Sequence, residues 1–283
     1  MANETTTTTL TELVQASIGQ ARVVEVPGAD LSDYVTRRPL EPGKGSATFP
    51  YYDEETMASV AEGTDLSNTA FDTTAVTITP GEYGLMTTLT DLADRRSATQ
   101  AGFDIGNVMG EAYKVAKNSA IYNLFDGFST ALGTTNVDIT EALIQQAVAT
   151  LRAKKAPGPL YLACTPWVME DLLGLYSSNT NNVADSIRNQ AMETGTLPPI
   201  HGVTPLLVAG LPAGTSAGQI DEADTKTAIF SAAALGFVEE WDFNIETERD
   251  ASLRATEIVA TASFGVGEIK DDWGVELLVD NKD

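Results

Sequence analysis

The sequence predicts an α+β protein, because helical and strand patterns follow one another without strict β–α–β alternation. The first observation is the stretch TTAVTITPGEYGLMTTLTD (73–91), in which Val76 and Ile78 fall on one side of an extended chain and threonines on the other. The second is the segment 97–125, whose apolar residues recur at spacings of three or four and so form one stripe of a long helix. No internal repeat accompanies these patterns.

Length and composition place the chain among proteins that bury a real core, since 43% of its 283 residues are hydrophobic. It contains no run of about 18 uncharged apolar residues, which a membrane-spanning helix requires. Its start, MANETTTTTL, lacks the basic and apolar regions of a secretory signal. The single cysteine, Cys164, lies in an apolar run and is expected to be a small buried residue, which fits a reducing cytoplasm.

The net charge of −23 argues against binding to a nucleic-acid backbone, which requires clustered lysines and arginines. Acids are concentrated in residues 221–283, which hold 16 acids and 5 bases. This charge is consistent with a solvated surface that keeps the protein soluble. A sharper interpretation is a face that must not adhere to a nearby polyanion, and the sequence leaves both interpretations open.

Residues 1–36 are expected to form an arm, because no part of them can bury much of itself. Residues 1–9 are polar and rich in threonine, and such segments stay disordered unless a partner orders them. Residues 11–20 have the pattern of a short amphipathic helix, and residues 21–36 are predicted to be extended chain broken at a Pro-Gly pair.

Residues 37–92 are predicted to form a long hairpin with little core of its own. Two extended segments flank a polar connection that contains glycine. A protruding hairpin is marginal alone, so it should lie against something, and a neighbouring subunit is the natural candidate. The arginine pairs at its two ends are either solvated charges or partners of acidic patches on another subunit. The candidate intersubunit contacts are Arg37, Arg38, Arg95, Arg96, Phe49, Tyr51 and Tyr52.

Further along the chain, helices and strands mix. The helix at 97–125 would be roughly 43 Å long at about 1.5 Å per residue. A second helix is predicted to begin at Asp138, with Glu141 in the capping-box position, and to end near Lys155. The remaining predicted elements are a buried strand at 160–164, a helix at 166–177, a strand at 202–210 and closing strands from residue 227 onward.

No motif in the chain carries a convincing catalytic or metal site. The stretch GTSAG (214–218) matches the nucleophile elbow of serine hydrolases, but the only histidine, His201, precedes Ser216 instead of following it. A hydrolase that uses Ser216 therefore stays a distant alternative. One histidine cannot hold zinc alone, and the acidic runs at 53–55 and 271–272 lack the spacing of a calcium loop. We expect no catalytic residue, cofactor or metal.

The tryptophans are scattered through the chain, and each lies in apolar sequence. We expect all of them to anchor the core rather than to form a ligand cage. They are Trp167, Trp241 and Trp273.

An arm, a hairpin, a long helix, a mixed body and terminal strands, in that order, resemble the major capsid protein of tailed bacteriophages. This is the Hong Kong phage-type capsid fold, which encapsulin nanocompartments share. The most telling stretch runs from FDTTAVTITP at residue 71 to KNSAIYNLF at residue 125, and the segment KDDWGVELLV (270–279) is similar to the last strand of many such proteins. The resemblance covers nearly the whole chain as an order of elements.

The resemblance implies a division of the chain into parts. An N-terminal arm is expected at 1–36, the extended loop (E-loop) at 37–92, a peripheral domain at 93–134 with the spine helix 97–125, an axial domain at 135–242, further peripheral strands at 243–270, and a final axial strand and tail at 271–283.

The resemblance also implies a function. Copies of the chain would form pentamers and hexamers and close into an icosahedral shell around packaged double-stranded DNA, without sequence-specific DNA binding and without a membrane. The shell would assemble in the bacterial cytoplasm and become the virion capsid. Expected partners are further copies of the chain, a separate scaffolding protein, a portal and, optionally, a decoration protein. An encapsulin shell around a cargo enzyme is the alternative, although encapsulins generally lack a long N-terminal arm.

Overall fold

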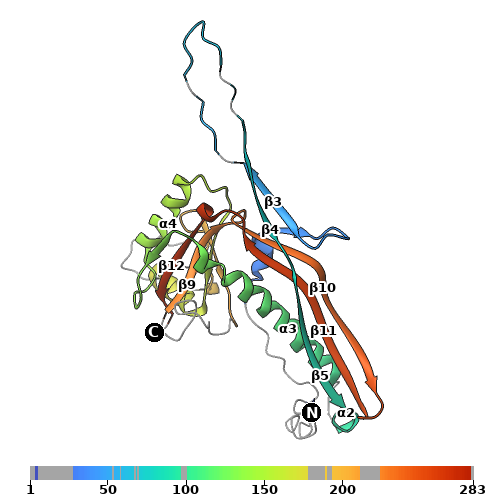
Figure 1. The fold of residues 1–283 in the computed structure, drawn as a ribbon. Helices are drawn as coiled ribbons and strands as arrows, with labels where there is room; N and C mark the ends of the chain where they lie inside the picture. The colour runs from blue at the N-terminus through green and yellow to red at the C-terminus, as the bar shows by residue number, and fades with distance from the viewer. Residues whose placement is uncertain are drawn as a thin grey trace.

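The computed structural model describes residues 4–5, 28–52, 54–57, 59–66, 68, 70–96, 101–177, 189, 193–210 and 224–281. The helix expected at 11–20 and the GTSAG stretch lie outside these residues. Figure 1 shows a body that carries helix α4 (Glu141–Ala153), a long sheet that runs along helix α3 (Ala101–Tyr122), and a hairpin that projects away from both. None of the described helices combines the length and apolarity that a bilayer span requires.

The long sheet has five strands, and its centre is an antiparallel pair that extends far from the body. This pair, β10 with β11, runs from Leu235 opposite Glu268 to Asp250 opposite Ala255, and its register shifts twice between Glu239 and Asn244. In spatial order the strands are β1 (Glu4–Thr5), β5 (Gly81–Thr90), β11 (Ala255–Glu268), β10 (Leu235–Asp250) and β2 (Thr36–Pro39).

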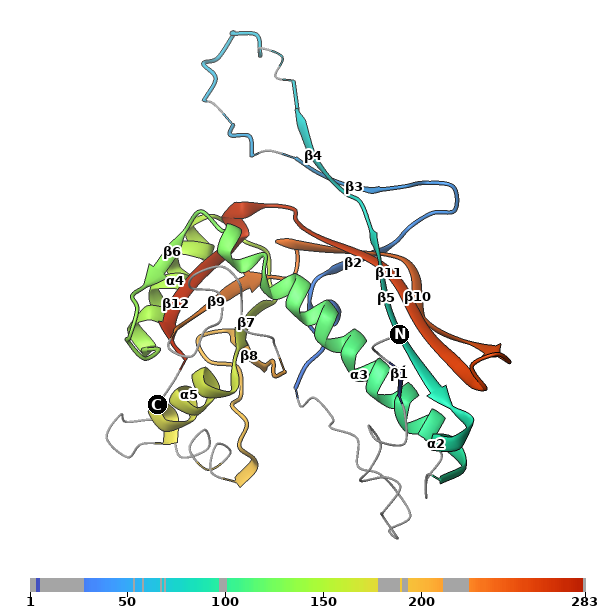
Figure 2. The ribbon, with the colours of Figure 1, turned by 60° about the horizontal axis from the view of Figure 1, so that its bottom comes forward.

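Helix α3 (Ala101–Tyr122) lies along one face of the long sheet (Figure 2). Met109 is buried on that face with Ile258 and Ala260 of β11. The predicted stripe is wrong at Val108, one of the regularly spaced apolar residues that predicted the helix, because Val108 is 51% exposed. The sequence predicts a helix over 97–125, of which residues 97–100 are not described. The described helix ends at Tyr122, before a short 3-10 helix, η2 (Phe125–Gly127).

A second, five-stranded sheet forms the body. Helix α4 (Glu141–Ala153) and helix α5 (Pro166–Ser177) contribute to the same apolar core as this sheet. The final strand, β12, is an interior strand, because it pairs with both β6 and β9. In spatial order the strands are β6 (Ala131–Gly133), β12 (Gly274–Asp280), β9 (Asp224–Ser231), β7 (Leu160–Cys164) and β8 (Val203–Leu207).

Several local predictions for the body are confirmed. Strand β7 and helix α5 occupy the predicted ranges, and Cys164 is fully buried. The predicted N-cap of α4 is wrong. The cap is Thr140 rather than Asp138, because the Thr140 hydroxyl accepts a hydrogen bond from the Leu143 N–H at 3.3 Å.

The extended chain expected over 21–36 is also corrected. Residues Leu31–Tyr34 form a 3-10 helix, η1. The carboxylate of Asp30 caps it by accepting a hydrogen bond from the Ser32 N–H at 3.0 Å. Such a local bond from an aspartate to the backbone two residues later competes with extended structure.

The hairpin consists of β3 (Ala47–Tyr52) and β4 (Thr73–Ile78), paired antiparallel from Ala47 opposite Ile78 to Tyr52 opposite Thr73. Its base is packed, because Phe49 and Ile78 are buried with Val238 of β10. Beyond that base, the chain between the two strands projects from the molecule in both views (Figures 1 and 2). After β4 the chain passes Pro80 and continues into β5, so the hairpin and the long sheet are directly connected.

Candidate assembly surfaces

The outer part of the hairpin exposes large apolar side chains that the chain itself does not cover. Leu66 is 82% exposed, Phe71 71% and Tyr52 72%. Exposed apolar groups gathered on one projecting element usually mark a protein contact. The exposed apolar residues of this hairpin tip are Tyr52, Met57, Val60, Leu66 and Phe71.

The hairpin tip is also acidic. No lysine or arginine occurs from residue 45 to residue 94. Of the acids, Glu54 pairs with Lys155, just beyond α4, whereas Glu62 and Asp65 lie exposed farther out. A surface that is both apolar and acidic suits a protein partner that offers apolar area and cations, and it is unsuited to a nucleic-acid backbone.

The base of the hairpin is held to its own chain. Phe49 is buried, and the ammonium of Lys270, just after β11, lies 4.8 Å from the centre of the Tyr51 ring. Two of the predicted intersubunit contacts, Phe49 and Tyr51, therefore face the same chain here, whereas Tyr52 faces outward.

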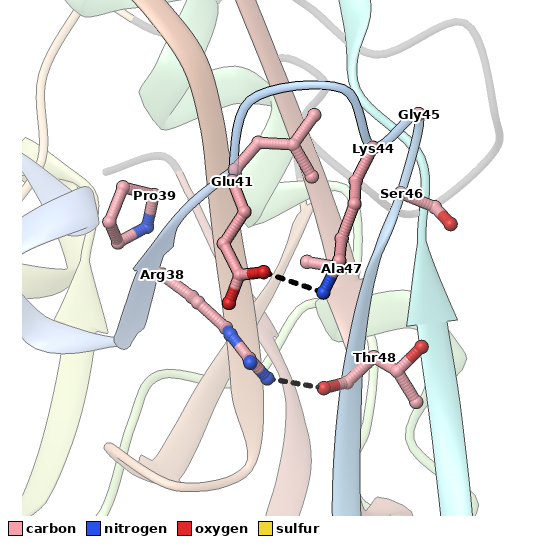
Figure 3. Close-up of a pocket in the computed structure, with 9 residues that line it drawn as sticks. Arg38, Pro39, Glu41, Lys44, Gly45, Ser46, Ala47 and Thr48 are labelled. Atoms are coloured by element: carbon pink, nitrogen blue, oxygen red, sulfur yellow. Dashed lines mark hydrogen bonds and ion pairs between the residues drawn. The ribbon is translucent and has the colours of Figure 1, made fainter.

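The two predicted arginine pairs differ in their surroundings. Arg37 donates to Glu239 at 2.5 Å, and this bond raises the pKa of Arg37. Arg38 donates to the carbonyl of Thr48 at 2.6 Å (Figure 3). This pair thus ties β2 to β10 and to the hairpin. Arg95 and Arg96 end helix α2 (Asp91–Arg96) and are exposed.

The turn between β2 and β3 encloses a cavity of 380 Å³ (Figure 3). Across it Lys44 pairs with Glu41 at 2.6 Å, and both side chains are 60% exposed. The walls offer no nucleophile with a neighbouring base, so the cavity has the character of a polar contact surface rather than of an active site. All of its lining residues fall between Arg38 and Thr48, within the turn and the two strand ends that it joins.

A second apolar surface lies where β5 meets α3, and we call it the β5–α3 groove. Its cavity measures 220 Å³ and opens between Tyr83 and Leu85 on one side and Ala112 and Ala116 on the other. The alanines leave this space because small side chains on the helix do not reach the strand. Tyr83 and Leu85 remain 45% and 47% exposed. Further exposed apolar residues are Met86 of β5 and Val108 of α3.

The segment that follows the N-terminal arm is fastened to α3. The amide of Asn118 accepts from the Leu31 N–H at 2.8 Å and donates to the Ala29 carbonyl at 3.0 Å. Lys117 pairs with Asp30 at 2.5 Å. Burial acts to raise the pKa of Asp30, but the hydrogen bonds from Lys117 and Ser32 and the charge of Lys117 outweigh it and lower that pKa.

Other residues singled out in the sequence take no part in these surfaces. The Nε2 atom of His201 lies 3.0 Å from the carboxylate of Glu141, at the start of α4. The prediction that the tryptophans are core anchors is wrong for Trp167 and Trp241, which are 46% and 40% exposed. Ser216 lies outside the described residues. Within the described part of the chain, no group of three or more histidine, cysteine, aspartate or glutamate side chains is placed to hold a metal ion.

The sequence reasoning missed the apolar residues that the structure leaves uncovered. Leu66 and Phe71 stand alone in a stretch of polar and acidic residues, and that isolation is the signal that could have marked them. Tyr83 and Leu85 gave no such signal, because they continue the alternation of an ordinary strand.

Comparison with known proteins decides the family. The profile of the phage capsid protein family matches residues 73–275, from the return strand of the hairpin to β12. The chain belongs to the phage capsid protein family. It is accordingly a structural protein of the virion capsid, as the order of its elements suggested.

Solved structures confirm the Hong Kong phage-type α+β fold over almost the whole chain. A chain of Mycobacterium phage Che8 matches with a TM-score of 0.71 and 15% identity, covering 93% of this chain and 97% of the other. A chain of Gordonia phage Cozz gives 0.68 and 14%, over 94% and 91% of the two chains. The capsid of Ralstonia phage GP4 gives 0.68 and 9%, over 95% and 96%. A search of curated proteins finds no match.

Proposed function

We propose that this chain is the major capsid protein of a tailed bacteriophage, and that it assembles as pentamers and hexamers into an icosahedral shell around packaged double-stranded DNA. The observation that carries the proposal is the projecting hairpin on a capsid-family fold. Its tip holds large apolar side chains that its own chain leaves exposed, and such a surface usually marks a contact with another molecule.

The same proposal implies a division of the chain into the parts of a tailed-phage capsid protein. In it, residues 1–36 are the N-terminal arm, 37–92 the E-loop, 93–134 and 243–270 the peripheral domain, and 135–242 with 271–283 the axial domain. Support comes from β11, which belongs to the long sheet, and from β9 and β12, which belong to the body sheet. Strand β10 crosses the proposed boundary at residue 242, and β6 belongs to the body sheet although it lies in the peripheral range.

The contact between copies is proposed to join the hairpin tip of one subunit to the β5–α3 groove of the next. The tip offers Leu66, Phe71 and exposed acids, and the groove offers Tyr83 and Leu85. Helix α2 follows the other end of β5 and exposes the Arg95–Arg96 pair there, so the proposed contact extends along β5 from the groove to these arginines. Apolar area then meets apolar area, and acids meet arginines, which gives both burial and charge complementarity.

The acidity of the chain favours a shell protein that encloses DNA over a protein that binds DNA. With a net charge of −23, an inner wall would repel the DNA it encloses and let it move during filling. Scaffolding and portal proteins, and optionally a decoration protein, complete the proposed set of partners, and assembly is proposed to occur in the host cytoplasm. Acids placed mainly on the outer face of the shell would overturn the repulsion argument.

Electron microscopy of the full chain tests the proposal, first with the protein expressed alone and then with a scaffolding protein. Closed shells, or isolated rings of five and six subunits, are expected. Compact monomers under every condition would contradict it and would return attention to Ser216. A shell that encloses an enzyme instead of DNA would identify the encapsulin alternative.

The proposed contact has its own test. Replacing Arg95 and Arg96 together by glutamate is expected to prevent rings and shells while the subunit stays folded, because it sets like charges against the hairpin tip. Arg152→Glu is the control, since Arg152 is also exposed but lies on α4, away from α2. Normal shells from the Arg95→Glu/Arg96→Glu variant would show that the arginines do not take part.

A further inference from the structure

Two short connections join the long sheet to the body sheet, and they lie against each other. One is the turn between β9 and β10, and the other is the segment between β11 and β12 that includes the 3-10 helix η3 (Asp271–Trp273). The carbonyl of Ala234 in the first accepts from the Ile269 N–H at 2.7 Å and the Lys270 N–H at 3.2 Å in the second. The angle between the two sheets is therefore set at this place, which we call the joint.

A third segment, the chain that follows α3, is fastened to the joint by a carboxylate. Asp271 accepts from the Ser129 N–H at 2.7 Å and from the Ser129 hydroxyl. The Glu268 carboxyl, at the end of β11, lies against the same segment, because a Cβ added to Gly127 would be 3.1 Å from its Oε2 atom. Both carboxyls thus meet one short stretch of chain.

The two carboxyl groups lie together beside residues 127–129. Burial, the charge of Asp271 and a hydrogen bond with Asp271 raise the pKa of Glu268 to about 7. A carboxyl that is protonated near neutrality can donate its proton to a neighbouring carboxylate, whereas two neighbouring ionised carboxylates repel.

The cations around the joint are engaged with other groups. Lys154 of the α4 C-terminus donates to Asp272 at 2.7 Å, and Lys226 of β9 pairs with Asp126 of η2. Lys270 lies over the rings of Tyr51 and Trp273, at 4.8 and 5.1 Å from their centres. Among the described residues, the charged group that acts on Glu268 is Asp271.

We propose that Glu268 and Asp271 share one proton and form a clasp that holds the joint between the two sheets. With the proton in place, Glu268 donates its O–H to the Asp271 carboxylate, and Asp271 stays bound to Ser129. When the proton passes to solvent, two adjacent negative charges remain, and the three segments of the joint separate more readily. The base of the hairpin follows the joint, because Tyr51 rests on Lys270.

Hydrogen exchange of the unassembled full chain tests the clasp, so the result does not depend on shell formation. Protection of the Ser129 and Ile269 amides, corrected for the intrinsic pH dependence of exchange, is expected to fall by about tenfold between roughly pH 5.5 and 8.5. This corresponds to about one pKa unit of linkage, which allows for the exposed part of Glu268. Core amides of β7 should show no such fall.

Glu268→Gln separates the clasp from a merely structural role, because glutamine keeps a donor but cannot lose a proton near neutrality. Its Ser129 and Ile269 amides are expected to have a protection independent of pH. Asp272→Asn, one residue from Asp271 but paired with Lys154, is the matched control and should keep the wild-type pH dependence. Wild-type protection that does not change with pH would overturn the proposal without any variant, as would a Glu268→Gln variant that titrates like the wild type.

Discussion

The proposed contact predicts that two side chains at the hairpin tip control assembly without affecting the fold. Leu66 is 82% exposed and Phe71 is 71% exposed, so the subunit gains little from either. Replacing both by serine should change the free energy of unfolding of the monomer by no more than about 0.5 kcal/mol, as is usual for surface substitutions.

The cost to assembly follows from the area that the contact would cover. Complete burial of a leucine or phenylalanine side chain contributes about 1.5–3 kcal/mol. Scaled by the exposed fractions of Leu66 and Phe71, the double substitution removes about 2–5 kcal/mol from each contact. Since about 1.4 kcal/mol corresponds to a factor of ten, each contact weakens roughly thirty-fold to a few thousand-fold, and a closed ring repeats the loss at every contact.

Analytical ultracentrifugation over a range of protein concentrations measures this effect directly. The Leu66→Ser/Phe71→Ser variant should remain a monomer at concentrations where the wild type forms rings or shells. Asn68→Ala, on the same exposed loop but neither apolar nor charged, is the control and should assemble almost normally. If the double variant assembled at the same concentration as the wild type, the hairpin tip would not be the contact, and the reasoning from exposure would fail.

Three further substitutions test the fold itself. Asn118→Ala should lower the unfolding free energy by about 2–4 kcal/mol in a urea titration, because it strands a buried backbone N–H; the exposed Asn107→Ala on the same helix is the control, and equal losses would refute this. Gly274→Ala would place a Cβ 2.1 Å from the Phe128 ring and should cost about 1–3 kcal/mol, whereas wild-type stability would show that the ring moves freely. Burial, then neighbouring carboxylates, raises the pKa of Asp171 from 3.8 to about 6, so its stabilising contribution is complete below pH 3.8 and lost as pH rises through 6. Asp171→Asn should flatten that decline in thermal midpoints, and an unchanged profile would contradict it.

Local signals in the sequence account for the elements that were predicted. The alternation of Val76 and Ile78 reports a strand because neighbouring side chains of a strand point to opposite faces. Pro166 marks the start of α5 because its fixed φ and missing N–H suit the first helical position. Local signals could not identify the N-cap of α4, because Asp138 and Thr140 are both residue types that cap helices well. The direction in which the chain enters the helix selects Thr140.

The surfaces and the joint depend on residues far apart in the chain, and no local pattern reports such pairs. Asn118 meets Leu31 across 87 positions, and Ser129 meets Asp271 across 142. Trp167 was misjudged because apolar neighbours in sequence do not establish burial on a helix, one side of which faces solvent. Leu66 and Phe71 are exposed because no other part of the described chain packs against them, and such packing is visible only in the folded structure.

The interior position of β12 has a consequence for the order of synthesis. Chains are made from the N-terminus, and domains fold as their residues emerge from the ribosome. Strand β6 pairs with β12 but with no other strand of the body sheet, so that sheet stays open until residues 274–280 have emerged. A ribosome that stops early therefore releases a subunit whose body has an open edge beside β9. Such a product lacks a completed body sheet, which leaves it open to cellular proteases.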